Sequence, residues 1–286
     1  MRTRRIRPGA LLAALLSAVL LAAGGAVASA SAATPKTTYY VSLGDSLAKG
    51  YMPGMGDTDQ GYTDRLFTAL KAKDPSLQHV KLGCSGATTT TLLNGGGACA
   101  YPEGTQLAAA ERFLRAHRGQ VRYLTLDIGA NDVARCASAT GIDMTCASAG
   151  LHTVGDNLAK ILPRLRTAGG PKVQYAGMTY YDPFLAAWLT GSQGQQLAQL
   201  SEFVQELLNG IISFGLRWHD FAVADVATAF STRSFTPTVP LPGVGEVPLN
   251  VARICQWTFM CLKHDIHANP TGYQVLADTF AAVLKR

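Results

Sequence analysis

The feature that most constrains the fold of this chain is an alternation of short apolar segments with longer helical ones. Five segments rich in β-branched and other apolar residues are each short enough to form a buried strand: residues 38–43, 79–82, 121–128, 173–178 and 221–224. Between and after them, apolar residues recur at helical spacing in residues 62–72, 105–116, 154–165, 193–216 and 271–284. Strands that alternate with helices form parallel βαβ units with right-handed crossovers. The sequence therefore predicts a three-layer α/β/α sandwich around a parallel five-stranded sheet.

The first 30 residues have the features of a secretory signal peptide. Four arginines lie within the first seven residues, and an apolar run follows over residues 10–23, interrupted only by Ser17. This run is shorter than the roughly 20 apolar residues that span a membrane, which favours cleavage over anchoring. We predict a signal peptide over residues 1–30, cleaved near Ala30 or Ala32, and one domain over residues 34–286. The paired arginines leave both the general secretory and the twin-arginine route open.

The net charge gives no reason to expect a nucleic-acid partner once the leader is set aside. The whole chain has 25 Lys and Arg against 19 Asp and Glu, a formal charge of +6. Cleavage after residue 30 removes four arginines and leaves 256 residues with 21 basic and 19 acidic side chains. A nearly neutral protein is not attracted to the phosphate backbone. We expect a secreted, extracellular monomer with no membrane span after cleavage.

Six cysteines lie in the predicted mature part, an even number that indicates disulfides in an exported protein. They fall in sequence as three close pairs. If each cysteine bonds to its near neighbour in sequence, the disulfides are Cys84–Cys99, Cys136–Cys146 and Cys255–Cys261, and we favour this pairing. The alternative is a zinc site, but no C-x-x-C or H-x-x-x-H spacing supports one. We expect no metal and no cofactor.

Polar residues follow several of the predicted strands, where an α/β sheet usually carries its active site. Ser46 follows the first strand in Gly-Asp-Ser, a sharp turn that can present a nucleophile. Gly86 follows the second strand and Asn131 the third, and His267 precedes the last helix. Each is unremarkable alone, because such residues also cap helices and form turns. Together they supply a nucleophile, hydrogen-bond donors and a general base.

In this order the four residues resemble the sequence blocks of the SGNH hydrolases, the GDSL esterase and lipase family. The resemblance spans almost the whole predicted mature chain and implies a serine hydrolase with a flavodoxin-like α/β/α fold. It assigns Ser46 as nucleophile and His267 as base, with the oxyanion held by the N–H groups of Ser46 and Gly86 and by the side chain of Asn131. The cysteine pattern further resembles that of secreted actinobacterial esterases, lipases and phospholipases.

One position departs from the family pattern. The family usually has an aspartate three residues before the histidine, but that position is His264 here, and the acid, Asp265, is only two residues before His267. Asp265 could orient His267 by local adjustment. Alternatively, the backbone carbonyl of His264 accepts the Nδ1–H and the site is a Ser–His dyad. The shifted position of the acid slightly favours the dyad.

The expected function is hydrolysis of carboxylic esters through an acyl-enzyme. Residues 235–260 form a long segment in which prolines are interleaved with apolar side chains, and they could line an acyl-chain pocket or simply pack onto the domain. This segment favours a lipid or other apolar ester as the substrate, which would be a small molecule or a lipid. The alternatives are a carbohydrate O-deacetylase of the same fold and a secreted binding module without catalytic activity.

Overall fold

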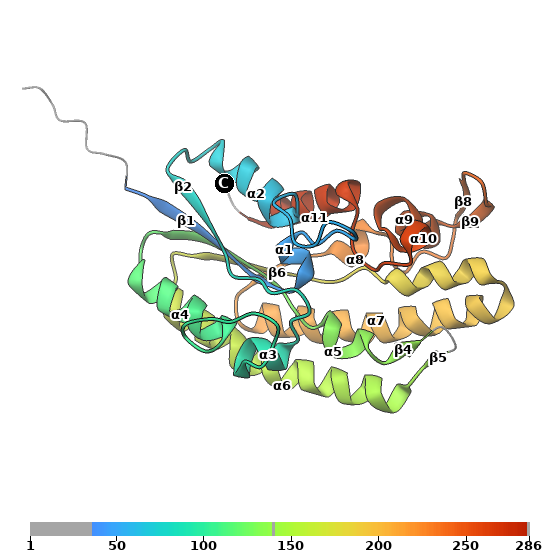
Figure 1. Ribbon diagram of the computed structural model, residues 1–286, viewed down its shortest axis with the longest axis horizontal. Coiled ribbons are helices and arrows are strands. Elements are labelled where there is room, and N and C mark those ends of the chain that lie inside the picture. The colour runs from blue at the N-terminus through green and yellow to red at the C-terminus, as the bar shows by residue number, and fades with distance from the viewer. Residues whose placement is uncertain (1–35, 139–140, 285–286) are drawn as a thin grey trace, which may run out of the picture. The chain divides into compact units, whose positions relative to one another are not determined.

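A parallel sheet of five strands lies at the centre of the computed structural model, which describes residues 36–138 and 141–284. The strand order is β2-β1-β3-β6-β7 (Figure 1). The strands are β1 (Thr38–Gly44), β2 (Leu77–Lys81), β3 (Val121–Asp127), β6 (Gln174–Met178) and β7 (Ala222–Ala224). All pairings are parallel, so the five predicted strands and the α/β/α architecture are confirmed. The predicted signal peptide lies outside the described residues.

Helices cover the two faces of this sheet (Figure 1). One layer contains α3 (Thr89–Asn94), α4 (Gln106–Ala116), α6 (Met144–Gly169) and α7 (Ser192–Trp218), and the other contains α2 (Tyr62–Lys71) and α11 (Pro270–Val283). The remaining helices are α1 (Ser46–Lys49), α5 (Ala130–Ala134), the 3-10 helix η1 (Pro183–Thr190), α8 (Val226–Ala229), α9 (Leu249–Trp257) and α10 (Met260–Lys263). No helix in the described ranges is long and apolar enough to cross a membrane.

The central strands are buried on both faces, which explains their nearly continuous apolar sequences. In β3, Leu124 and Leu126 are at most 2% exposed, and the strand pairs with β1 on one side and β6 on the other. Each strand of a sheet sandwiched between two helical layers must be apolar at consecutive positions rather than alternate ones. Burial of a Leu side chain stabilises the folded protein by about 1.5–3 kcal/mol. These strands therefore stabilise the sheet that positions the site residues.

Helix α6 extends well beyond the segment predicted from its apolar spacing. It begins at Met144, because the Asp143 side chain accepts hydrogen bonds from two backbone N–H groups of the first turn. Gly150 interrupts the apolar pattern, but a Cβ there would lie 2.6 Å from the carbonyl oxygen of Asp132. A glycine at this position allows α6 to pack closely against α5.

Three disulfides join the cysteines that are near neighbours in sequence, as predicted. Cys84 is bonded to Cys99, Cys136 to Cys146 and Cys255 to Cys261, with Cα–Cα distances of 5.9, 5.6 and 5.0 Å. Each bond closes a loop near one of the proposed site residues in sequence. In the chain-entropy model, closing the 15-residue loop of the first pair stabilises the folded state by about 3 kcal/mol, and the two shorter loops contribute less.

Residues 235–260 are not a structureless loop. They contain the hairpin of β8 (Thr238–Leu241) and β9 (Gly245–Pro248), followed by α9. Leu241 and Val247 of the hairpin pack with Val251 and Ala252 of α9 in a small core of their own. A second antiparallel pair joins β4 (Ala137–Ser138) and β5 (Gly141–Ile142).

Candidate active site

Strand β1 ends in a tight turn that places Ser46 at the beginning of α1. Gly44 has φ +139°, and a Cβ there would lie 2.2 Å from the carbonyl oxygen of Asp127, so only glycine fits. Asp45 caps α1 by accepting a hydrogen bond from the Leu47 N–H at 2.9 Å. The Ser46 N–H has no acceptor among the described residues. It is therefore available at a helix N-terminus for an electronegative atom of a ligand.

The structure brings His267 into contact with Ser46, 221 residues earlier in the chain. The His267 Nε2 lies 2.7 Å from the Ser46 Oγ. The imidazole is also packed against the ring of Tyr51, with ring centroids 4.5 Å apart. The His267 side chain is only 14% exposed, which limits competition from water for this hydrogen bond. The geometry allows the imidazole to take the hydroxyl proton.

Backbone contacts on both sides of His267 fix its position. The His267 carbonyl accepts from the Phe259 N–H at 2.9 Å, and the carbonyl of Ile266 accepts from the Tyr181 hydroxyl at 2.8 Å. Asn269 then caps α11 by accepting from the N–H groups of Thr271 and Gly272. The histidine thus lies in a short segment that is held at both ends.

Asp265, and not the carbonyl of His264, contacts the other ring nitrogen of His267. The Asp265 Oδ1 lies 2.7 Å from Nδ1 and also accepts the backbone N–H of His267 at 3.0 Å. His264 has a left-handed backbone with φ 53°, which ends α10 and turns the chain just before the acid. This turn lets an acid two residues before the histidine reach its ring. The slight preference for the His264 carbonyl is therefore wrong for this structure.

The two other proposed oxyanion residues lie in neighbouring segments, Asn131 in α5 and Gly86 in the turn between β2 and α3. Asn131 lines the pocket beside Ser46, and its Nδ2 donates to the carbonyl oxygen of Ala87 at 2.9 Å. This bond ties Asn131 to the loop of Gly86, which has φ +81° and open space where a Cβ would be. The Gly86 N–H has no acceptor within the described part of the chain. Gly86 itself is exposed and is not among the pocket-lining residues.

A pair of buried carboxyl groups lies beneath the nucleophile, and the sequence did not reveal it. Asp127 accepts hydrogen bonds from the Tyr62 hydroxyl and the Ala48 N–H, and Asp45 accepts from the Tyr180 hydroxyl at 3.0 Å. Burial raises the pKa of both acids, and the negative charge of Asp45 further raises the pKa of Asp127. Two adjacent carboxyl groups in a dry interior cannot both ionise readily. Through their hydrogen bonds to the backbone N–H groups of Asp45, Leu47 and Ala48, the two side chains stabilise the turn that carries Ser46.

A second serine–histidine contact occurs in the core and is not a site. The Ser42 Oγ lies 2.9 Å from the His79 Nε2, and Asp64 lies 3.9 Å from His79 Nδ1. Ser42 is fully buried, so no substrate can reach it. Burial lowers the pKa of His79 to about 3, which keeps the imidazole neutral. His79 is a packing residue, stacked on Tyr40 with centroids 4.5 Å apart.

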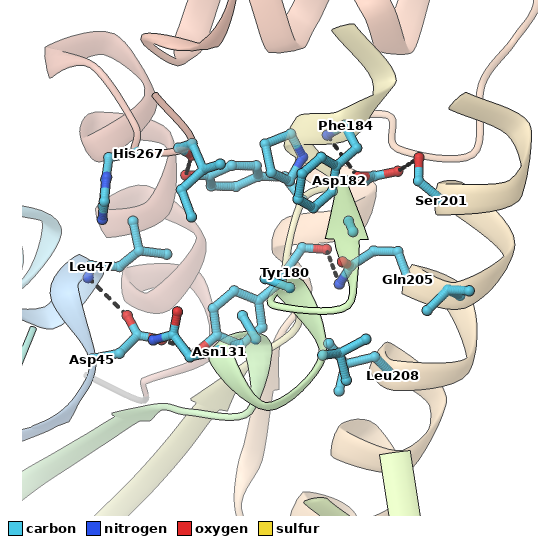
Figure 2. A pocket seen from close by; sticks show the side chains of 18 of the residues that line it. Asp45, Leu47, Asn131, Tyr180, Asp182, Phe184, Ser201, Gln205, Leu208 and His267 are labelled. Atoms are coloured by element: carbon cyan, nitrogen blue, oxygen red, sulfur yellow. Dashed lines mark hydrogen bonds between the residues drawn. The ribbon is translucent and has the colours of Figure 1, made fainter. Parts of the chain in front are cut away.

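A pocket extends from Ser46 and His267 to the inner face of α7 (Figure 2). Its walls are largely apolar, with side chains from α5, β4, β5, η1 and α7: Val133, Ala134, Ala137, Ile142, Pro183, Phe184, Val204 and Leu208. The walls contain no residue of 235–260. Of the two possibilities for this segment, packing onto the domain is the one observed: part of it forms a small cluster that contacts Trp188 of η1, and other side chains, Ile254 and Trp257 among them, pack in or against the main core.

One buried carboxyl group lies in the wall of this pocket. Asp182 accepts a hydrogen bond from the Ser201 hydroxyl at 2.6 Å and from the Phe184 N–H at 2.9 Å, and so joins η1 to α7 (Figure 2). Burial raises the pKa of Asp182 to about 7, and the negative charge of Glu202 adds to the rise. No group of three or more His, Cys, Asp or Glu side chains in the described ranges could hold a metal ion.

Comparisons with known proteins agree with this geometry. The model of the GDSL-like lipase/acylhydrolase family matches residues 42–275, a span that includes Ser46 and His267. No curated protein matches the chain in sequence.

Solved structures with this fold include two from Streptomyces. Phospholipase A1 from Streptomyces albidoflavus NA297 has a TM-score of 0.51 at 19% identity, with 86% of this chain and 99% of that chain covered. An extracellular lipase from Streptomyces rimosus has a TM-score of 0.55 at 18% identity, with 86% and 100% covered. At these identities the likeness concerns the fold.

Proposed function

This chain belongs to the GDSL-like lipase/acylhydrolase family and is a carboxylic ester hydrolase, and we propose that it is a secreted serine esterase acting on apolar acyl esters. The observation that carries the proposal is the continuous hydrogen-bonded chain from Ser46 through His267 to Asp265, at the end of an apolar pocket. The three disulfides support the extracellular location.

In the proposed acylation step, His267 Nε2 accepts the proton of the Ser46 hydroxyl as Oγ attacks the ester carbonyl. The bond to the leaving alcohol then breaks, and the imidazolium returns the proton to the alcohol oxygen. Water repeats the sequence on the acyl-enzyme and releases the carboxylic acid and free Ser46. Asp265 would hold Nδ1–H and stabilise the imidazolium, as a carboxylate does in serine hydrolase triads.

The tetrahedral intermediate carries a negative oxygen that requires hydrogen-bond donors. The Ser46 and Gly86 N–H groups, both without an acceptor in the described ranges, and the Asn131 amide would supply them. One hydrogen of the Asn131 Nδ2 is engaged with Ala87, and the second is free to donate. In other serine hydrolases each such donor lowers the activation free energy by about 3 kcal/mol.

The pocket walls support an apolar acyl group as the part of the substrate bound beside Ser46. Aliphatic and aromatic side chains make up most of the lining. Burial of each methylene of an acyl chain contributes about 0.8 kcal/mol, so longer chains should bind better until the pocket is full. The names of the two Streptomyces neighbours, a phospholipase A1 and a lipase, point to the same class of ester.

Rates on p-nitrophenyl acetate, octanoate and palmitate test this proposal. We expect kcat/KM to be highest for octanoate or palmitate, and Ser46→Ala to abolish turnover of all three esters while the circular dichroism spectrum stays unchanged. A strong preference for acetate, accompanied by deacetylation of acetyl xylan, would favour a carbohydrate deacetylase. Undiminished turnover by Ser46→Ala would contradict the assignment of the nucleophile.

A further inference from the structure

Tyr51 contacts both members of the proposed Ser46–His267 pair. Its backbone N–H donates to the carbonyl oxygen of Ser46 at 3.0 Å, and its ring packs on the imidazole of His267, with centroids 4.5 Å apart. Ser46 and His267 are 221 residues apart in sequence. Tyr51 is therefore bonded to the nucleophile through its backbone and packed on the base through its side chain.

The backbone of Tyr51 is held on both sides. Helix α1 ends after one turn at Gly50, whose φ of +68° turns the chain back and lets the next residue donate to the Ser46 carbonyl. The Tyr51 carbonyl in turn accepts from the Tyr273 hydroxyl at 2.7 Å. Tyr273 is fully buried in α11, the helix that follows His267 in the chain. These bonds join Tyr51 to the element that carries the nucleophile and to the element that follows the base.

The hydrogen bonds of His267 leave one motion of its imidazole poorly restrained. The Ser46 Oγ and the Asp265 Oδ1 each lie 2.7 Å from a ring nitrogen. Because the lone pair and the N–H of an imidazole lie in the ring plane, these bonds resist movement within the plane more than tilting out of it.

The ring of Tyr51 is placed to restrain that tilting. Two rings that met only edge to edge in one plane would have centroids about 6 Å apart, because carbon atoms in contact stay about 3.5 Å apart. At 4.5 Å, with 43° between the planes, one of the rings overlies the other. The imidazole therefore cannot tilt toward Tyr51.

Tyr51 contacts the imidazole from outside the acyl pocket. His267 lines the pocket, whereas Tyr51 does not. The Tyr51 side chain is half-buried, and its hydroxyl has no hydrogen-bond partner in the part of the chain that the structure describes. The contact with His267 thus depends on the ring and not on the hydroxyl.

We propose that Tyr51 is a positioning residue, whose ring keeps the imidazole of His267 aligned between Ser46 and Asp265 during acyl transfer. This inference rests on the proposed function of the site. Misplacement of a reacting group by about 1 Å can slow an enzyme about a hundredfold. Loss of the ring should therefore reduce turnover and leave binding of the ester in the pocket nearly unchanged.

Steady-state hydrolysis of p-nitrophenyl octanoate by two variants of Tyr51 tests the proposal. Tyr51→Leu removes the ring, and we expect kcat to fall by about ten- to a hundredfold while KM stays within about twofold of the wild-type value. Tyr51→Phe keeps the ring and should retain nearly normal kcat. Thermal unfolding of each variant verifies that it is folded.

A second tyrosine–histidine contact in this chain supplies the matched control. Tyr39, at the opposite end of β1 from Ser46, is also half-buried and packs on His117 with ring centroids 4.6 Å apart. Tyr39→Leu removes the same kind of ring from the same kind of contact and should leave kcat unchanged. Equal falls in kcat in the two leucine variants would overturn the proposal.

Proton NMR supplies a measurement that needs no turnover. The Nδ1–H of His267, hydrogen-bonded to Asp265, should resonate far downfield and is assigned by its loss in His267→Ala. We expect this resonance to be sharp in the wild type and in Tyr51→Phe. In Tyr51→Leu it should be broadened by exchange with water, because the imidazole is held less firmly.

Normal kcat in Tyr51→Leu, an unchanged Nδ1–H resonance in that variant, or an equal loss of kcat in Tyr51→Phe would overturn the proposal. So would a change confined to KM, or one that differs between p-nitrophenyl and 4-methylumbelliferyl octanoate, because Tyr51 would then bind the substrate. A wild-type protein that neither hydrolyses esters nor reacts with a fluorophosphonate would instead refute the proposed function, and the NMR comparison would still decide the role of Tyr51.

Discussion

At the scale of single residues, the geometry of the site depends on how Asp265 reaches His267 from two positions upstream. The left-handed turn at His264 and the hydrogen bond from the His267 N–H to the Asp265 side chain make this approach possible. The spacing of the sequence alone suggested a different acceptor, because a side chain's reach depends on the backbone angles between the two residues.

Asp265→Asn tests whether this carboxylate acts in catalysis. We expect kcat to fall several hundredfold, since an amide neither stabilises the imidazolium nor selects its productive tautomer. Steady-state hydrolysis of a p-nitrophenyl ester measures the effect. His264→Gly is the matched control, because it keeps the backbone carbonyl and suits φ 53°, and it should have nearly normal kcat. Near-normal kcat in Asp265→Asn would instead support a dyad.

Asn131→Ala tests the proposed oxyanion donor. We expect kcat to fall by about 10² or more with little change in KM, because the lost hydrogen bond forms only in the transition state. Asn94→Ala, in an exposed position on α3, serves as the control. Because Asn131 also bonds to Ala87, thermal unfolding must show that the variant is folded. A change in kcat below about threefold would exclude Asn131 as an oxyanion donor.

At the scale of helices and strands, the contact between η1 and α7 depends on a buried carboxyl group. Burial raises the pKa of Asp182 from 3.8 to about 7, so the folded protein keeps this proton over a range in which the unfolded chain releases it. Between about pH 4 and pH 7 the folded state therefore binds more protons than the unfolded state. This group's contribution to stability falls as pH rises through that range.

Asp182→Asn should weaken that pH dependence, because an amide does not ionise and can still accept from the Phe184 N–H. Urea unfolding at pH 5 and pH 7.5 measures it. For the wild type we expect the Asp182 contribution to fall by a few kcal/mol between these values, and we expect a smaller loss in the variant. Asp156→Asn, on the exposed side of α6, is the control. Equal losses in wild type and Asp182→Asn would mean that Asp182 is ionised in the folded protein.

The elements themselves were largely predictable, and the pocket was not. The five strands and the main helices followed from apolar periodicity, which is a local property of the chain. The pocket walls come from α5, η1 and α7; η1 and α7 are consecutive, but α5 lies more than 40 residues earlier and meets them only through tertiary packing. Residues 235–260 are equally apolar but pack onto the domain, partly in a small cluster and partly against the main core. Composition could not distinguish these two outcomes.

At the scale of the whole molecule, the site exists only because the fold brings distant segments together. Ser46 follows the first strand and His267 precedes the last helix, 221 residues later. The order of Ser46, Gly86, Asn131 and His267 along the chain was sufficient to indicate the reaction class. Asp127 was not foreseen, because an acid at the end of a strand has the same local pattern whether it is buried or exposed.

The most direct test of the central claim is fluorophosphonate labelling of the folded protein, followed by mass mapping of its peptides. We expect one phosphonyl adduct, on Ser46, which disappears in Ser46→Ala and when the protein is unfolded in denaturant before labelling. Loss on unfolding is expected because His267 then no longer activates the serine. Absence of any adduct on the folded protein, or an adduct on another residue that persists in Ser46→Ala, would contradict the assignment of Ser46 as the nucleophile.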